Sequence, residues 1–145
     1  MKKDVWLSIK GIQHVGDESD TVELMTGGNL VIKDGKTFLT YKEKVDDQNE
    51  TTLLKVEGND RVTMSRMGPY RSHFIIEKGK RHLCHYGTDF GDLTIGICSQ
   101  KITSSLDESG GDLYFRYTID VNSAIASENE VLINVKECKR SWPTL

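Results

Sequence analysis

The stretch LYFRYTIDV, residues 113–121, has the clearest repeating pattern in the chain. Apolar or aromatic side chains occupy every second position from Leu113 to Val121, and mostly polar residues lie between them. This period of two is typical of a β-strand with one face in the core and one in solvent. No segment of helical length in the 145 residues carries an apolar stripe with helical spacing. The sequence therefore predicts an all-β protein.

The same alternation recurs along the whole chain, between short polar turns. It predicts strands near residues 5–15, 22–32, 37–43, 54–56, 61–66, 74–76, 81–86, 93–97, 113–121 and 131–135. Asp34-Gly35 predicts a type I′ hairpin, because both residues accept positive φ angles. Gly27-Gly28 interrupts its strand and predicts a β-bulge. The polar stretches 17–20 and 46–49 are expected to be turns.

About nine or ten strands with mostly short connections favour antiparallel pairing between sequence neighbours. Such a sheet must close or cover its edges, and an up-and-down barrel of about 8–10 strands closes it most simply. A β-sandwich is the alternative, disfavoured because only one connection is long enough to cross between two sheets. We therefore expect a single β-barrel domain over residues 1–145, with a polar C-terminal tail from about residue 138.

Several short motifs, taken in order, resemble a known family. They are Thr26-Gly27, Tyr41-Lys42-Glu43, Arg66-x-Gly68, Phe90-Gly91-x-Leu93, Ser105-Leu106-Asp107 and Gly111-x-Leu113-x-x-x-Tyr117. The chain is similar to the YwiB-like proteins, which are bacterial proteins of unknown function, and the similarity extends over nearly the whole chain before the tail. The resemblance implies a lipocalin-like, or calycin-type, β-barrel. It supplies no catalytic or binding residues.

Composition excludes several classes of function. A net charge of −3 offers no basic face for nucleic acid. No apolar run approaches the roughly 20 residues of a membrane-spanning helix, and the N-terminus lacks the apolar segment of a signal peptide. Three cysteines without framework spacing are expected to be free thiols, which favours a cytoplasmic protein. His82, Cys84 and His85 could not all bind one ion from a strand, so neither a metal nor another cofactor is expected.

One charged residue breaks the strand pattern in RVTMSRMGPY, residues 61–70. Val62, Met64 and Arg66 share the apolar phase, and Gly68-Pro69 then ends the strand. Arg66 is thus expected to point inward at a strand end. Alternate strand ends meet at one mouth of an up-and-down barrel, so Glu43, Tyr86 and Gln13 should lie near it.

Two interpretations of this cluster are open. An inward Arg66 needs a partner, so it could simply form an interior ion pair with Glu43, to which Tyr86 and Gln13 add hydrogen bonds. Alternatively, Arg66 could anchor the carboxylate or phosphate of a ligand inside the barrel. The ligand-binding hypothesis includes Arg66, Glu43, Tyr86, Gln13, Tyr41 and Tyr117.

The function that we expect first is therefore binding of a small amphipathic or anionic molecule. The alternative is a filled barrel that serves as a protein-interaction module or a homodimer without a ligand. An enzyme that uses the Glu/Arg/Tyr cluster, with Glu43 as base, is the least favoured of the three. Neither a nucleic-acid nor a membrane partner is expected.

Overall fold

Ten antiparallel strands account for most of residues 2–138, the part of the chain that this computed structural model describes. They are β1 (Lys2–Val15), β2 (Glu18–Lys33), β3 (Lys36–Val45), β4 (Gln48–Glu57), β5 (Arg61–Met67), β6 (Ser72–Glu77), β7 (Arg81–Thr88), β8 (Gly91–Ser104), β9 (Gly110–Val121) and β10 (Ala124–Glu137). Each strand pairs with its sequence neighbours, and β1 pairs with both β2 and β10, so the sheet is a closed barrel. The predicted all-β antiparallel barrel is confirmed. Most of the predicted tail lies outside the described residues.

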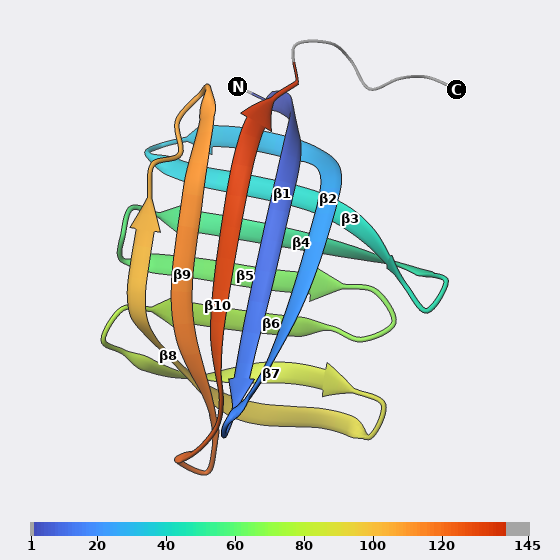
Figure 1. Cartoon of the computed structure of the whole chain (residues 1–145), viewed down its shortest axis with the longest axis vertical. Coiled ribbons are helices and arrows are strands. Elements are labelled where there is room, and N and C mark those ends of the chain that lie inside the picture. The colour runs from blue at the N-terminus through green and yellow to red at the C-terminus, as the bar shows by residue number, and fades with distance from the viewer. Residues whose placement is uncertain (1, 139–145) are drawn as a thin grey trace.

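The barrel is formed by two crossing sets of strands. In Figure 1, β1, β9 and β10 run along the front of the molecule, and β3 to β7 cross behind them. The long strands β2 and β8 bend and take part in both sets. The five hairpins that follow β1, β3, β5, β7 and β9 lie at one end of the barrel, which we call the mouth.

The turns follow the local sequence closely. Asp34 and Gly35 both have positive φ, 53° and 74°, as a type I′ turn requires, so the predicted hairpin is confirmed. Asp46 and Asp47 also both have positive φ, at 52° and 63°. Side chains that can hydrogen-bond locally make this conformation accessible to aspartate.

The predicted bulge at Gly27-Gly28 is wrong. The β1–β2 register runs through both glycines without a shift, and Trp6 and Val5 are their partners. Gly28 instead permits a close approach: a Cβ there would meet the carbonyl oxygen of Thr40 and lie 2.9 Å from Cδ1 of Leu7. The register shifts occur in β8 and β10.

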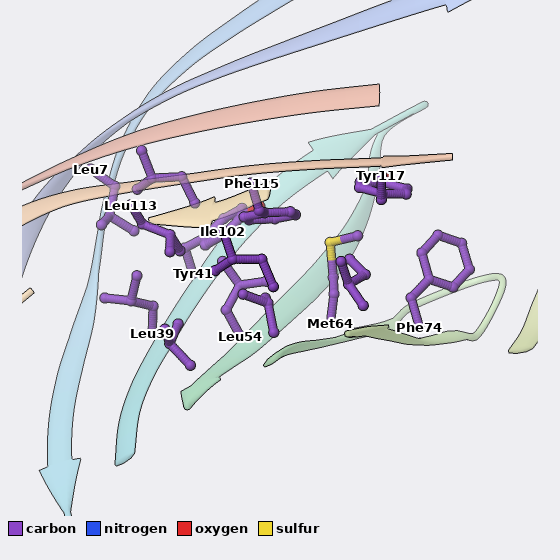
Figure 2. Packing of buried hydrophobic residues seen from close by; sticks show 14 of the residues in the cluster. Leu7, Leu39, Tyr41, Leu54, Met64, Phe74, Ile102, Leu113, Phe115 and Tyr117 are labelled. Atoms are coloured by element: carbon purple, nitrogen blue, oxygen red, sulfur yellow. The ribbon is translucent and has the colours of Figure 1, made fainter. Parts of the chain in front are cut away.

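The interior away from the mouth is filled by side chains. Figure 2 shows this core, which extends from Leu7 and Leu39 to Phe74 and Tyr117. Leu39 and Phe115 have no exposed surface. Burial of this kind stabilises the fold by about 25 cal/mol per Å² of apolar surface. Side chains therefore pack the interior on the side away from the mouth.

Candidate functional site

The mouth holds a cavity of about 380 Å³, which we call the mouth cavity. Five of the six residues predicted for the site line it: Gln13, Glu43, Arg66, Tyr86 and Tyr117. Its volume lies within the usual range for small-molecule pockets, about 300–1,000 Å³. The topological argument thus brings the correct side chains to one place, and their role in binding stays a prediction.

A smaller chamber of about 130 Å³ adjoins the mouth cavity on the side of the core. Tyr41, the sixth predicted residue, lines this inner chamber together with Leu54, Met64 and Phe115. Glu43 and Arg66 line both spaces. A molecule in the mouth cavity could therefore extend an apolar group toward the core.

Strand register places the polar side chains of one wall in a single row. Tyr41, Thr52, Arg66, Ser72 and Tyr86 are successive partners across β3, β4, β5, β6 and β7. Directly paired residues of antiparallel strands point to the same face of the sheet. Arg66 is therefore held among hydroxyl-bearing neighbours.

The opposite wall carries a second polar row. Asp20, Gln13, Asn129 and Tyr117 are successive partners across β2, β1, β10 and β9. All four line the mouth cavity, so this row faces Arg66 and Tyr86 across it.

The cavity is open because β2 and β3 separate near the mouth. Residues 18–27 of β2 pair with β1 only, and β3 beyond Tyr41 pairs with β4 only. A side-chain hydrogen bond from Thr26 Oγ1 to the Lys42 carbonyl oxygen, at 3.4 Å, crosses this gap. The split exposes Val22 to solvent, although it lines both spaces.

Arg66 has a different partner from the one that the sequence suggests. Its Nε lies 3.9 Å from Oε1 of Glu50, whereas no ion pair joins it to Glu43 within the described residues. The reason is position: Glu50 is on β4, next to β5, while Glu43 is one strand farther away. The Arg66 side chain is also 42% exposed, so the charge lies at the mouth and is not sealed in the core.

The mouth contains buried polar atoms that lack a hydrogen bond. Among side-chain nitrogen and oxygen atoms of residues 2–138, Thr52 Oγ1 and Arg66 Nε are the buried ones that lack a hydrogen bond, and the two residues are direct cross-strand partners. Unsatisfied buried polar groups are rare in folded proteins because each carries a desolvation cost. Because the two atoms lie on paired residues, this part of the wall could form further hydrogen bonds with a bound molecule.

Two tyrosines near Arg66, Tyr117 and Tyr41, have raised pKa values. Burial raises the pKa of Tyr117 to about 12, although the charge of Arg66 acts in the opposite direction. Burial also raises the pKa of Tyr41, again against the effect of Arg66. Both hydroxyls are thus hydrogen-bond donors at neutral pH.

Sequence reasoning did not include Asp20, Glu50, Thr52 or Asn129 in the site. Asp20 lies in a stretch expected to be a turn, but β2 already begins at Glu18. The period of two could have identified the others: Asn129 is in phase with Val131, and Glu50 and Thr52 are in phase with Leu54. Polar residues near an open end simply look like turn residues.

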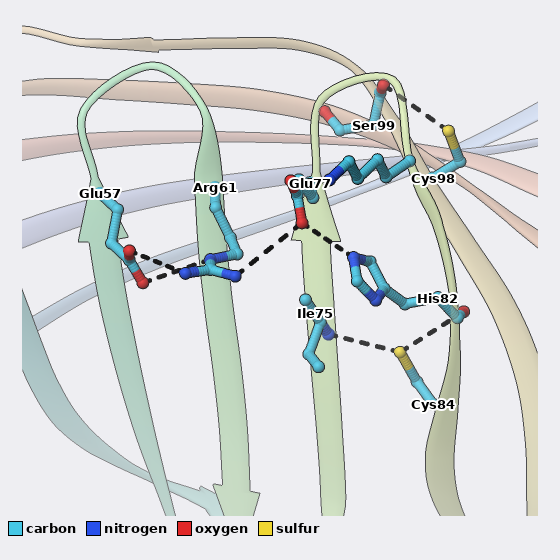
Figure 3. A network of polar contacts seen from close by, with 9 residues as sticks. Glu57, Arg61, Ile75, Glu77, His82, Cys84, Cys98 and Ser99 are labelled. Atoms are coloured by element: carbon cyan, nitrogen blue, oxygen red, sulfur yellow. Dashed lines mark hydrogen bonds and ion pairs between the residues drawn. The ribbon is translucent and has the colours of Figure 1, made fainter.

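A second polar cluster lies near the end of the barrel opposite the mouth. Arg61 forms an ion pair with Glu57 at 2.9 Å, and His82 Nε2 is hydrogen bonded to Glu77 Oε1 at 2.9 Å. Figure 3 shows how these side chains lie. Residues 2–138 hold no group of three or more His, Cys, Asp or Glu side chains that could bind a metal ion. His82 is thus engaged by a carboxylate, and this cluster is an ion-pair network at the strand ends.

Comparison with known proteins places the chain in a family. The model described as "Domain of unknown function (DUF1934)" matches residues 7–133. The chain belongs to the DUF1934 family. This DUF1934 chain is also 26% identical over 117 residues to the uncharacterized β-barrel protein YwiB of Bacillus subtilis (strain 168), covering 81% of this chain and 82% of YwiB. The resemblance to the YwiB-like proteins is confirmed.

A solved structure supports the fold of this DUF1934 chain. The crystal structure of the ywiB protein from Bacillus subtilis matches it with a TM-score of 0.83 and 24% sequence identity, covering 95% of this chain and 94% of that one. This similarity concerns the barrel alone, and a relation to lipocalins and other calycins stays a prediction. Residues 2–138 contain no helix of the length and apolarity needed to cross a membrane.

Proposed function

We propose that this chain binds a small amphipathic molecule at the mouth of its barrel. The observation that carries the proposal is the joint lining of two adjoining spaces. Arg66 and Glu43 line both the mouth cavity and the inner chamber, whose other walls include Leu54, Met64 and Phe115. A polar head group on Arg66 and an apolar group toward the core would use both.

The unpartnered atoms near Arg66 support the same function. A ligand oxygen that accepts from Arg66 Nε would supply a hydrogen bond that the described residues do not. Arginine also binds carboxylate and phosphate groups in a fixed geometry. The volume of about 380 Å³ suits a small ligand rather than a polymer.

Native mass spectrometry of freshly purified protein, followed by titration with amphiphiles, tests this function. We expect a bound small molecule, or saturable binding of an added one, with affinity reduced at least about tenfold by Arg66→Met, the loss of one charged hydrogen bond. Arg116→Met is the matched control, because Arg116 pairs with Glu128 and lines neither space. Equal binding by wild type and Arg66→Met, with the folded state retained, would contradict the proposal.

A protein-interaction module or homodimer is the second candidate. The mouth hairpins carry exposed apolar side chains, among them Tyr70, Leu93 and Phe90, the last of which is 98% exposed. Exposed apolar residues that gather in one region are a feature of contact surfaces. The same mass spectra distinguish the two roles: a ligand-free dimer that Phe90→Ser dissociates would favour this second candidate.

A further inference from the structure

We propose that the mouth cavity selects a zwitterionic ligand in which an apolar tail, an anionic group and a cationic group follow one another in that order. This inference rests on the proposed ligand-binding function and specifies its ligand class. It replaces the simple anion that an inward arginine alone would suggest.

The wall of the mouth cavity carries more negative than positive charge. Arg66 is the one cationic side chain that lines the mouth cavity among the described residues, whereas Asp20, Glu43 and Glu130 contribute carboxylates. Glu130 is engaged on the outer side by His14, at 2.9 Å, and by Tyr114, at 2.7 Å. Asp20 and Glu43 have no ion-pair partner within residues 2–138. A ligand with only negative charge would be attracted by one group and repelled by several.

Side chains follow a definite order along two paired strands of this wall. On β3 the inward residues are Leu39, Tyr41 and Glu43, and on β4 their direct partners are Leu54, Thr52 and Glu50. The wall therefore consists of an apolar layer, a hydroxyl layer and a carboxylate layer, from the core to the mouth.

Adjacent strand β5 fits the same layers. Met64 pairs with Leu54 in the apolar layer, and Arg66 pairs with Thr52 in the hydroxyl layer. The Cα atoms of Glu43 and Glu50 lie two residues closer to the mouth, about 7 Å at the usual rise of a strand. The Glu50 carboxylate extends back to within 3.9 Å of Arg66 Nε, whereas Glu43 has no ion-pair partner among the described residues. A tail toward Met64, an anion at Arg66 and a cation near Glu43 would match each layer.

The surroundings of Tyr117 support the same ligand independently of the acidic residues. Tyr117 is 94% buried, lines the cavity opposite Arg66, and its hydroxyl has no hydrogen bond to any described residue (its remaining surface is 6%). Arg66 Nε also lacks a hydrogen bond, so two donors that line the same cavity have no hydrogen-bond acceptor among the described residues. Two such donors call for an acceptor-rich group, such as a phosphate diester, at that depth.

Four hexyl probes with different head groups test the inference. Hexylphosphocholine has the proposed order of charges, and a hexyl sulfobetaine has the reverse order. Hexyl phosphate and hexyltrimethylammonium carry one charge each. We expect calorimetry to give hexylphosphocholine about tenfold tighter binding than the other three, because it alone places both charges beside groups of opposite sign.

Two variants test whether Arg66 and Glu43 cause the preference for hexylphosphocholine. Glu43→Gln should weaken hexylphosphocholine binding and improve that of hexyl phosphate, so that the two affinities converge. Arg66→Met should weaken both. Glu128→Gln is the control, because this carboxylate pairs with Arg116 and lines neither space. It should leave all affinities unchanged.

The possible failures are distinguishable. If hexyl phosphate or the sulfobetaine binds as tightly as hexylphosphocholine, and Arg66→Met still abolishes binding, the zwitterion inference is wrong and the ligand site stands. If no probe binds, or if Arg66→Met changes none of the affinities, the proposed function itself is contradicted.

Discussion

At the scale of single residues, position 28 requires glycine more clearly than the other positions discussed. A methyl group at this position would meet the Thr40 carbonyl oxygen, in the backbone of the adjacent strand β3. We expect Gly28→Ala to lower the free energy of unfolding by about 1–3 kcal/mol, the range of overpacked cores. Urea denaturation measures the change.

Gly11 provides the matched control for Gly28. Both glycines lie within strands, but a Cβ at Gly11 would meet nothing within 4 Å. Gly11→Ala should therefore leave the urea midpoint nearly unchanged or raise it slightly, because alanine restricts the unfolded chain. Equal losses in both variants would show that close approach is not what requires glycine at position 28.

Tyr117 gives a second prediction, at alkaline pH. Because burial raises its pKa from 10.0 to about 12, the folded state retains this proton more strongly than the unfolded state does. The retained proton of Tyr117 contributes about 3 kcal/mol to the free energy of unfolding. This contribution is fully present below pH 10 and is lost as the pH rises toward 12. Tyrosinate absorbance should show a late step that Tyr117→Phe removes. Tyr70→Phe, a change outside the cavity, should leave that step in place.

At the scale of strands, the β6–β7 seam is the weakest part of the barrel wall. Its ladder has two residue pairs, Ser72–Tyr86 and His73–His85, whereas the β1–β10 ladder has ten. Beyond this ladder, the Ile75 amide donates to the sulfur of Cys84 at 3.3 Å, as Figure 3 shows. A thiol is a weak acceptor compared with a carbonyl oxygen.

Hydrogen exchange should locate this seam. We expect amides of β6 and β7 to exchange faster than those of β1 and β10, because local opening there breaks fewer backbone hydrogen bonds. Cys84→Ala should accelerate the Ile75 amide further. Cys98→Ala should not affect it, because the Cys98 sulfur hydrogen bonds to the Ser99 carbonyl oxygen, at 3.8 Å, and not to a backbone amide of β6. Uniform protection around the barrel would contradict the prediction.

The strands themselves could largely be predicted from the sequence, but their ends near the mouth could not. Alternation identifies a strand where one face is dry, as for Leu113, Phe115 and Tyr117. Near the mouth both faces of a strand are exposed to solvent, so the alternation of apolar and polar residues is lost and Asp20 resembles a turn residue. Arg66 was detectable because it follows two apolar residues in the inward phase. The ion-pair partner of Arg66 depends on which strand lies next to β5. A pattern of polar and apolar residues does not show this.

At the scale of the whole molecule, carboxylates in hydrogen-bonded pairs make the free energy of unfolding depend on pH in the acid range. The hydrogen bond from Arg61 lowers the pKa of Glu57, and that from Arg81 lowers the pKa of Asp120. His82 acts in the same way on Glu77. Their stabilising effect is present above the ordinary values of 4.5 and 3.8 and is lost as the pH falls through the depressed values.

Urea denaturation between pH 6 and pH 2 should therefore show a falling midpoint, with most of the loss below about pH 4. Asp120→Asn, which cannot titrate, should be less stable at pH 6 and lose less on acidification. A midpoint independent of pH in this range would show that these pairs contribute nothing measurable.

Closure of the barrel was predictable from the strand count and the short connections, because an open sheet of this size would leave exposed edges. The extent of closure was not predictable. The inner chamber of about 130 Å³ is smaller than a complete ligand pocket, and the larger space is at the mouth. Whether a barrel is filled depends on side-chain volumes summed around each layer, which no single strand reveals.

The separation of β2 from β3 also affects how the protein behaves at high concentration. It leaves two stretches of backbone with a strand partner on one side only, and such edges can recruit the same edge of another molecule. The charges along them oppose this: Asp20 and Glu23 lie on the β2 edge, and Lys42 and Lys44 on the β3 edge. Like charges would face each other when identical edges meet. Neutralising these four side chains should thus turn the entrance of the barrel into a nucleus for fibre formation.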